Sequence, residues 1–310
     1  MIELQSLSKR YGERTVVDSV TMSIPSGTVA AIVGTSGSGK STLLRMINRL
    51  IEPSAGEVRI DGRDTALTPG HLLRRQIGYV IQGHGLFPHR SVADNVATVP
   101  RLLGWQPARI AARVDELLTL FQLEPGQYRH KFPHELSGGQ QQRVGVARAL
   151  AAEPAVLLMD EPFGALDPII RDKAQEDLLA IQRRFGTTVV IVTHDMDEAF
   201  RLGTRIGVMS GGRLLQFDHP ARLLTDPADP FVERLTGTND RALKLLSLTT
   251  AAALAEPGQG AVTVPATATG RDVLSALLWG EAGAASVVDA DGQPLGRVTF
   301  EALRRHGRHA

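Results

Sequence analysis

The sequence contains no cysteine, which excludes disulfides and thiolate metal sites. This absence suits a reducing compartment, and the cytoplasm is the simplest assignment. Aromatic residues make up only 5% of the chain, and no apolar run approaches the roughly 20 residues that a membrane-spanning helix needs. The N-terminus carries Glu3 and lacks the apolar stretch of a secretory signal. The sequence therefore predicts a chain that does not cross a membrane by itself.

Net charge is also nearly absent, because 34 basic side chains balance 33 acidic ones to leave +1. No net field would steer the molecule toward nucleic acid, so we expect no nucleic-acid partner. The chain has 310 residues, of which 43% are apolar. That is enough for one large domain with a sizeable core and a smaller second domain.

Short, continuous apolar runs without polar alternation recur through the centre of the chain: Val29 to Val33, Ala155 to Met159, Val189 to Val192 and Ile206 to Met209. Such runs are typical of strands buried on both faces, as in a parallel sheet. Helical patterns lie between them, for example Leu43, Ile47 and Leu50 after the first run. The fold class predicted is therefore α/β, with a mainly parallel sheet core.

Other segments surround this core. The opening segment and Glu57 to Gly62 alternate and contain turns, which indicates an antiparallel β edge layer. Residues 91–148 are mostly helical in pattern, interrupted by Pro100, Pro107 and Pro125, and predict a helical subdomain.

The composition changes after about Leu235, and residues 249–270 are rich in Ala, Thr, Gly and Pro, as in a linker or a weakly packed start. We expect domains at 1–237 and 251–310, joined by a connecting segment at 238–250. In the tail, strand patterns at 285–288 and 296–298 flank an Asp-Gly turn, and Thr299 is a candidate N-cap.

A glycine-rich loop follows the first buried run and precedes an amphipathic helix. Glycines let successive backbone N–H groups point inward, and the helix N-terminus adds partial positive charge, so the loop suits phosphate. Lys40 would neutralise the β- and γ-phosphates, and the Ser41 hydroxyl is placed to ligate Mg²⁺. A plain glycine turn is the alternative, which the flanking strand and helix disfavour. The loop comprises Gly34, Thr35, Ser36, Gly37, Ser38, Gly39, Lys40, Ser41 and Thr42.

Polar side chains follow the ends of other predicted strands. Asp160 and Glu161 end the second buried run, and consecutive side chains of a strand point to opposite sides, so Asp160 can serve Mg²⁺ while Glu161 acts as general base toward water. His194, after the third run, is a candidate γ-phosphate contact. Gln82, after Ile77 to Ile81, could ligate Mg²⁺ or the attacking water. Taken alone, the acid pair is more typical of a solvated strand end and His194 of a structural residue, and Gln82 carries no signal.

A second glycine-rich element opens a helix whose residues Val144, Ala147 and Leu150 share one face. It comprises Ser137, Gly138, Gly139 and Gln140. An ordinary N-cap at Ser137 is the alternative to a ligand site.

Together these motifs resemble the ATP-binding cassette family over Ile2 to Gly237. The resemblance implies ATP as ligand and a head-to-tail homodimer, in which Ser137 and Gly139 of one copy close over ATP on the phosphate loop of the other. It also implies that Tyr11 stacks on adenine and that Asp167, in FGALDP, works across the dimer interface. Thr35 stands where the family usually has proline.

A finer resemblance, carried by Ile77 to His89, Asn95 to Trp105 and Gly237 to Leu248, points to the branch that energises uptake of quaternary-amine osmoprotectants such as glycine betaine, choline, carnitine or proline betaine. It implies an ATPase at the cytoplasmic face of the membrane, separate permease subunits docked near Gln82 and the helical lobe, and an external solute-binding protein. The alternatives are an importer ATPase for another solute, such as an amino acid, and a soluble family member of translation or DNA repair. Val287 to Leu303 resembles a single cystathionine-β-synthase (CBS) repeat, with a sensory or a stabilising role.

Overall fold

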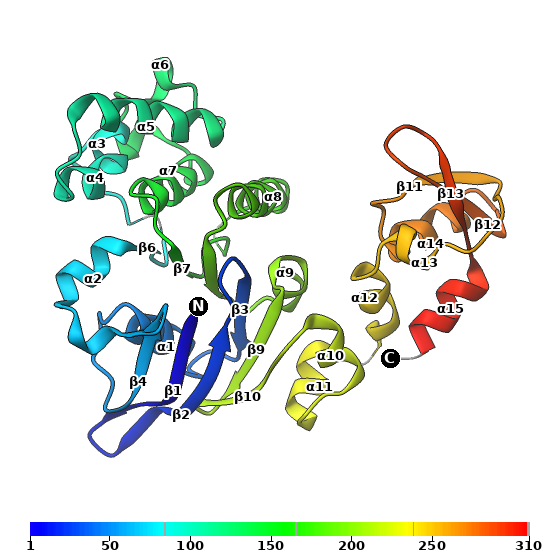
Figure 1. Cartoon of the computed structure of the whole chain (residues 1–310), viewed down its shortest axis with the longest axis horizontal. Helices are drawn as coiled ribbons and strands as arrows, with labels where there is room; N and C mark the ends of the chain where they lie inside the picture. The colour runs from blue at the N-terminus through cyan, green and yellow to red at the C-terminus, as the bar shows by residue number, and fades with distance from the viewer. Residues whose placement is uncertain (84, 165, 238, 309–310) are drawn as a thin grey trace. The chain divides into compact units, whose positions relative to one another are not determined.

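The computed structural model describes residues 1–83, 85–164, 166–237 and 239–308. Contacts divide the chain into two compact units, Met1–Phe217 and Asp218–Ala310. Figure 1 shows the helices and strands of both. Among the described residues, no helix combines the length and the apolar character that crossing a membrane requires.

The first unit is built on a six-stranded sheet in the order β10-β9-β3-β8-β7-β6. β6 pairs with β7, β7 with β8, β8 with β3 and β3 with β9, all in parallel. Every residue of β3, β7 and β8 is buried, which confirms the prediction of a parallel sheet buried on both faces. The strands are β3 (Val29–Gly34), β6 (Ile77–Val80), β7 (Val156–Asp160), β8 (Thr188–Val192), β9 (Arg205–Ser210) and β10 (Arg213–Asp218).

The sheet lies between two hydrophobic cores, because alternate residues of one strand belong to different clusters. In β7, Leu157 and Met159 pack into the cluster of the helical lobe, whereas Val156 and Leu158 pack into the cluster that holds α1 and the antiparallel strands. The helices on the sheet are α1 (Lys40–Ile47), α8 (Pro168–Phe185) and α9 (Met196–Leu202). The prediction that Leu50 continues the apolar face of α1 was wrong: α1 ends at Ile47, and Leu50 is 49% exposed.

An antiparallel sheet in the order β2-β1-β4-β5 forms the predicted edge layer. Its strands are β1 (Ile2–Tyr11), β2 (Arg14–Ile24), β4 (Ala55–Ile60) and β5 (Arg63–Asp64). β1 pairs with both β2 and β4, and its buried Ile2, Leu4 and Leu7 join the α1 core. The hairpin between β1 and β2 therefore carries Tyr11 at the end of a well-anchored strand.

Residues 91–148 form the predicted helical lobe, which Figure 1 shows gathered away from β1 and β2 within the first unit. Its helices are α3 (Val92–Val96), α4 (Thr98–Leu102), α5 (Pro107–Leu120), α6 (Pro125–Tyr128), η2 (Pro133–Glu135) and α7 (Gly138–Leu150); η1 (Thr65–Leu67) and α2 (Gly70–Gln76) precede it. Pro107 and Pro125 start helices, whereas Pro100 lies within the first turn of α4, where its missing N–H would have no intrahelical partner.

The second unit holds a three-stranded sheet in the order β11-β12-β13, with β11 parallel and β13 antiparallel to β12. Thr299 is the N-cap expected from the sequence, because its Oγ1 accepts a hydrogen bond from Ala302 N at 3.1 Å. The elements are α10 (Pro220–Thr225), α11 (Pro230–Thr236), α12 (Arg241–Ser247), α13 (Ala251–Leu254), β11 (Val262–Pro265), α14 (Gly270–Trp279), β12 (Ala284–Val288), β13 (Pro294–Thr299) and α15 (Phe300–Arg308).

The structural units begin and end at other places than the sequence suggests. Contacts assign α10, α11 and α12 to the second unit, although the sequence places a domain end at Gly237 and a connecting segment at 238–250. Within that segment, Leu245 and Leu246 are buried, and Leu246 joins the core of the second unit. The functional domain limits and the likeness of 251–310 to a CBS repeat stay predictions.

Candidate functional site

The glycine-rich loop joins β3 to α1, as predicted, and two of its glycines have no room for a side chain. A Cβ on Gly34 would lie 2.1 Å from the Met209 carbonyl oxygen, and one on Gly39 would lie 2.5 Å from the Val16 carbonyl oxygen. Both glycines have positive φ, at 151° and 98°. The close packing holds the loop against β9 and β2 and starts α1 directly at Lys40.

Lys40 places its ammonium group inside this loop. Its Nζ donates hydrogen bonds to the carbonyl oxygens of Gly34 at 2.8 Å and Thr35 at 3.0 Å. Burial lowers the pKa of Lys40, while the carboxylates of Glu161 and Asp160 act in the opposite direction. A cation and backbone N–H groups that share one concave loop form an anion site.

The loop forms one wall of a cavity of about 440 Å³. Tyr11, which is 51% exposed, lies at its rim, and the acidic Glu161 and the amide of Gln82 line it as well. The structure thus brings together the aromatic, phosphate-binding and acidic residues that the sequence separates by up to 150 positions. The lining residues are Tyr11, Arg14, Val16, Ser36, Gly37, Ser38, Gly39, Lys40, Ser41, Thr42, Gln82 and Glu161.

Asp160, the last residue of β7, is fully buried and fixed through both carboxylate oxygens. Ser41 Oγ donates a hydrogen bond to Oδ1 at 2.8 Å, and Arg45 Nη2 lies 3.5 Å from Oδ2. The hydroxyl and the carboxylate that the sequence assigns to one metal are therefore in direct contact.

Glu161 diverges from Asp160 for a reason other than the strand alternation expected from the sequence. β7 ends at Asp160, and Glu161 adopts a left-handed conformation with φ at 47°, which costs about 1 kcal/mol for a residue with a Cβ. Its N–H is held by the Val192 carbonyl oxygen at 2.9 Å. This turn aims the Glu161 carboxylate into the cavity while Asp160 stays buried.

Gln82 and His194 flank the Glu161 carboxylate. Gln82 Nε2 donates to Oε2 at 3.2 Å, and His194 Nδ1 lies 3.5 Å from Oε1. His194 is 63% exposed and follows β8 through the buried Thr193. The structure therefore joins three residues whose sequence signal was weak one by one. In this arrangement the side-chain nitrogen of Gln82 faces Glu161.

The second glycine-rich element starts α7 with a reciprocal cap. Ser137 Oγ accepts from Gln140 N at 3.3 Å, and Gln140 Oε1 accepts from Ser137 N at 2.9 Å. Gln140 Nε2 also donates to Tyr128 Oη at 3.2 Å. A Cβ on Gly139 would lie 2.9 Å from Cγ2 of Ile170, so the glycine allows α8 to approach. The Gln140 side chain thus holds the helix start in place.

Asp167 is the N-cap of α8, with Oδ1 accepting from Ile170 N at 3.1 Å. Of the described residues that line the cavity at the phosphate loop, none comes from 137–140 and none is Asp167. One copy of the chain therefore holds the phosphate loop and the Ser137 helix start as separate surfaces.

No sequence pattern singles out Arg14 and Val16, which line the cavity, or Arg45, which contacts Asp160. Arg45 lies four residues after Ser41, and this spacing places both on one face of α1. Nor does the sequence single out Glu198 on α9, which is buried and whose N–H donates to Asp195 Oδ1 at 3.1 Å. Burial, with the nearby Asp195, raises the pKa of Glu198 to about 7.

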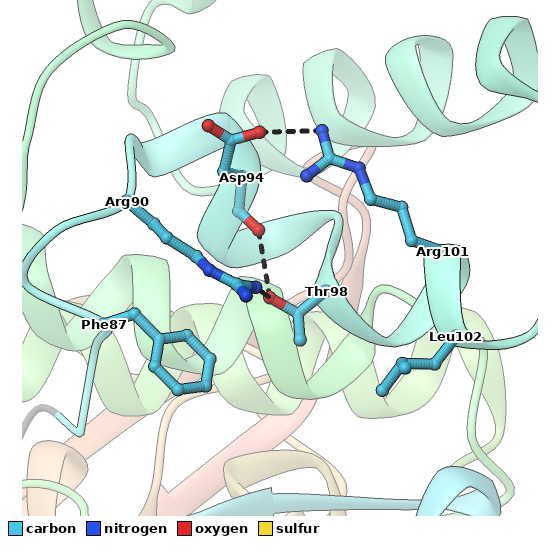
Figure 2. Close-up of a pocket in the computed structure, with 6 residues that line it drawn as sticks. All are labelled: Phe87, Arg90, Asp94, Thr98, Arg101 and Leu102. Carbon is cyan, nitrogen blue, oxygen red and sulfur yellow. Dashed lines mark hydrogen bonds and ion pairs between the residues drawn. The ribbon is translucent and has the colours of Figure 1, made fainter.

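A second cavity, of about 670 Å³, lies on the helical lobe and is lined by Phe87, Arg90, Asp94, Thr98, Arg101 and Leu102. The Asp94 carboxylate is held in its charged form and paired within it, because Ser91 Oγ and Arg101 Nη2 each donate to it at 2.7 Å and lower its pKa. Figure 2 shows the Arg90 side chain extended to the Thr98 hydroxyl, at 3.4 Å. The cavity therefore presents cationic and apolar groups.

The sequence is similar to proteins of known family. A family model described as ABC transporter matches residues 17–164, which include the phosphate loop, Gln82, 137–140 and Glu161. The glycine betaine uptake system ATP-binding protein YehX of Escherichia coli is 46% identical over 305 residues, 98% of this chain and 99% of that protein. The osmoprotectant import ATP-binding protein OsmV of Salmonella typhimurium is 44% identical, over 100% of this chain and 81% of its own length.

Solved structures are also similar to a large share of the chain. The dimeric structure of MJ0796, a bacterial ABC transporter cassette, is 37% identical with a TM-score of 0.64, over 71% of this chain and 98% of that one. A dimeric post-hydrolysis state of the same cassette, bound to ADP and Pi, is 35% identical with a TM-score of 0.63 over the same shares.

Proposed function

Because the chain belongs to the ABC transporter family, we propose that it is the ATP-hydrolysing subunit of an importer for quaternary-amine osmoprotectants such as glycine betaine. The observation that carries the proposal is the single cavity that holds Tyr11, Lys40 and Glu161 together. The choice of solute is supported by likeness over nearly the whole length to a glycine betaine uptake ATP-binding protein and to an osmoprotectant import ATP-binding protein.

In this proposal the phosphate loop binds the triphosphate of ATP. Lys40 leaves the Gly34 and Thr35 carbonyls to neutralise the β- and γ-phosphates, and Tyr11 at the rim stacks on the adenine. Glu161 takes a proton from the attacking water at its carboxylate, which Gln82 and His194 hold from either side. The left-handed turn at Glu161 keeps that base in the cavity.

We propose that Mg²⁺ accompanies ATP, held by Ser41, Asp160 and Gln82. The residues fit this ion: the Ser41 hydroxyl and the buried Asp160 carboxylate, in contact at 2.8 Å, are hard oxygen donors of the kind that Mg²⁺ prefers, and the Gln82 amide lines the same cavity. Among the described residues, no group of three or more His, Cys, Asp or Glu could hold a metal by itself, which suits an ion that also depends on phosphate oxygens. When bound, it neutralises charge on the β- and γ-phosphates.

We propose that two copies assemble head to tail, so that Ser137 to Gln140 and Asp167 of each copy close over the nucleotide of the other. This is supported by the separation of the two surfaces within one chain and by the dimeric state of the similar MJ0796 cassette. The preformed N-terminus of α7 offers N–H groups to the γ-phosphate. After hydrolysis that attraction falls, and the copies separate.

The proposed partners are integral membrane permease subunits, with an external solute-binding protein acting through them, and the chain lies at the inner face of the membrane. The cavity on the helical lobe is the proposed docking place, because it is open, presents Arg90 and apolar Leu102, and begins five residues after Gln82 at Phe87. When the two copies close, the permease segment docked in this cavity would move with the helical lobe.

Replacing Glu161 by Gln tests the catalytic part of the proposal. The variant should bind ATP and assemble into a dimer, which size-exclusion chromatography with ATP detects, while hydrolysis falls by about 10² to 10⁴-fold, since a general base contributes that much. Glu153→Gln, an exposed acid outside the cavity, is the matched control. Near-normal hydrolysis by Glu161→Gln would contradict the assigned role.

Uptake experiments test the solute. Cells that depend on this ATPase and its permease should accumulate labelled glycine betaine or choline, and the Glu161→Gln variant should abolish that uptake. An amino acid taken up in their place would support the alternative importer. Isolation with ribosomes or DNA and without any permease would favour the soluble alternative.

A further inference from the structure

The buried Asp160 has a second partner that the proposed chemistry does not use. Its Oδ1 is taken by Ser41, while Oδ2 faces Arg45 Nη2 at 3.5 Å. A buried carboxylate without a partner on one oxygen would be strongly disfavoured and free to rotate. Arg45 therefore compensates the side of the carboxylate that faces away from the phosphate loop.

Arg45 is itself held by the edge strand of the sheet. Tyr79, on β6, interacts with Arg45: the neighbouring Tyr79 hydroxyl, together with the charge of Asp160, raises the pKa of Arg45. In the parallel β6–β7 pair, Tyr79 is opposite Leu158, and Leu158 lies two residues before Asp160. Tyr79 also packs against the core that holds α1. Burial raises the pKa of Tyr79, so its hydroxyl stays neutral. Three elements, β6, α1 and β7, thus meet at one carboxylate.

We propose that Arg45, anchored by Tyr79, is a positioning residue for the magnesium site: by binding Oδ2 of Asp160 it keeps Oδ1 turned toward Ser41 and the phosphate loop. This inference rests on the proposed function, because it assumes that Asp160 and Ser41 hold Mg²⁺. If Arg45 acted only through its charge, removing it should instead tighten Mg²⁺ binding, since a cation next to the site would repel the metal.

The test measures ATP binding at increasing Mg²⁺ with the full chain in the Glu161→Gln background, using a fluorescent ATP analogue. Tyr79→Phe removes one hydroxyl and no charge. It should raise the Mg²⁺ concentration for half-maximal binding by about tenfold, the lower end of the effect of removing an outer partner of a metal ligand. Binding without Mg²⁺ should stay within about twofold of the parent. Arg45→Lys should shift the Mg²⁺ dependence in the same direction, because an ammonium cannot bridge Tyr79 and Asp160 as a guanidinium does.

Arg63→Gln is the control for lost positive charge, since Arg63 lies on β5 of the edge sheet and is exposed. It should leave the Mg²⁺ dependence unchanged. Unchanged Mg²⁺ dependence in Tyr79→Phe, together with tighter Mg²⁺ binding in Arg45→Gln, would overturn the positioning role. Equal loss of binding with and without Mg²⁺ in Tyr79→Phe would overturn it too, by showing a general structural defect. If the parent itself binds ATP independently of Mg²⁺, the magnesium proposal fails, and this inference falls with it.

Discussion

Replacing Glu198 by Gln should change how the stability of the chain depends on pH. Glu198 is 6% exposed, and its Oε1 has no hydrogen-bond partner among the described residues. Burial and then the charge of Asp195 raise its pKa from 4.5 to about 7; Glu161 acts in the same direction, and Thr193 and Arg171 oppose it. The native state therefore retains a proton that the unfolded chain has already released.

The sign and size follow from that difference. Because the folded-state pKa lies above the unfolded value, the stabilisation is complete below pH 4.5 and is lost as the pH rises to about 7. A shift of about 2.5 pKa units corresponds to about 3 kcal/mol in the free energy of unfolding, of which about 2.5 kcal/mol is lost between roughly pH 5 and pH 8.

The assay is urea unfolding of the wild-type chain and of Glu198→Gln, at about pH 5 and at about pH 8, without nucleotide. Gln has nearly the same shape but does not titrate, so the stability of the variant relative to the wild type should rise by about 2.5 kcal/mol from pH 5 to pH 8. Other titrating groups cancel in this difference. A difference that stays constant, or that moves the other way, would refute the view that Glu198 is protonated in its native surroundings.

Further changes test the site and its surroundings. Lys40→Ala should weaken ATP binding by about tenfold or more, since the charge-assisted contacts to phosphate are lost, and a nucleotide titration measures this. Gly34→Ala should lower the free energy of unfolding by more than about 2 kcal/mol, because its Cβ would meet the Met209 carbonyl oxygen. Gly37→Ala has open space around its Cβ and only an unfavourable φ, so it should lower the free energy of unfolding by about 1 kcal/mol. Equal losses in urea unfolding would contradict this difference. Arg90→Glu should reduce co-purification with the permease at least tenfold if the lobe cavity is the docking place, while Arg63→Gln should not.

The central part of the fold was predictable because its signals are local. β3, α1 and the loop between them follow from an apolar run, glycines and an amphipathic pattern that lie next to one another in the sequence. The capped start of α7 at Ser137 was visible for the same reason. The end of α1 was not, because Arg49 adopts a positive φ just after the helix, and the periodic pattern through Leu50 gives no sign of that turn.

The candidate site was predictable in its members but not in its connections. The contacts of Gln82 and His194 with the Glu161 carboxylate depend on the left-handed backbone conformation of Glu161. A glutamate at this position does not indicate such a conformation. Arg14 lines the cavity only because the β1–β2 hairpin folds over the loop. The burial of α12 within the second unit likewise depends on contacts with residues far along the chain.

Ser137 and Gln140 cap the start of α7 reciprocally, and Gln140 also donates a hydrogen bond to Tyr128. These hydrogen bonds hold the backbone groups that we propose to meet the nucleotide of a second copy before any encounter, so less conformational entropy should be lost when two molecules join. Loss of the Gln140 side chain would then slow assembly by loosening this rigid surface, even if no atom of that side chain ever touches ATP.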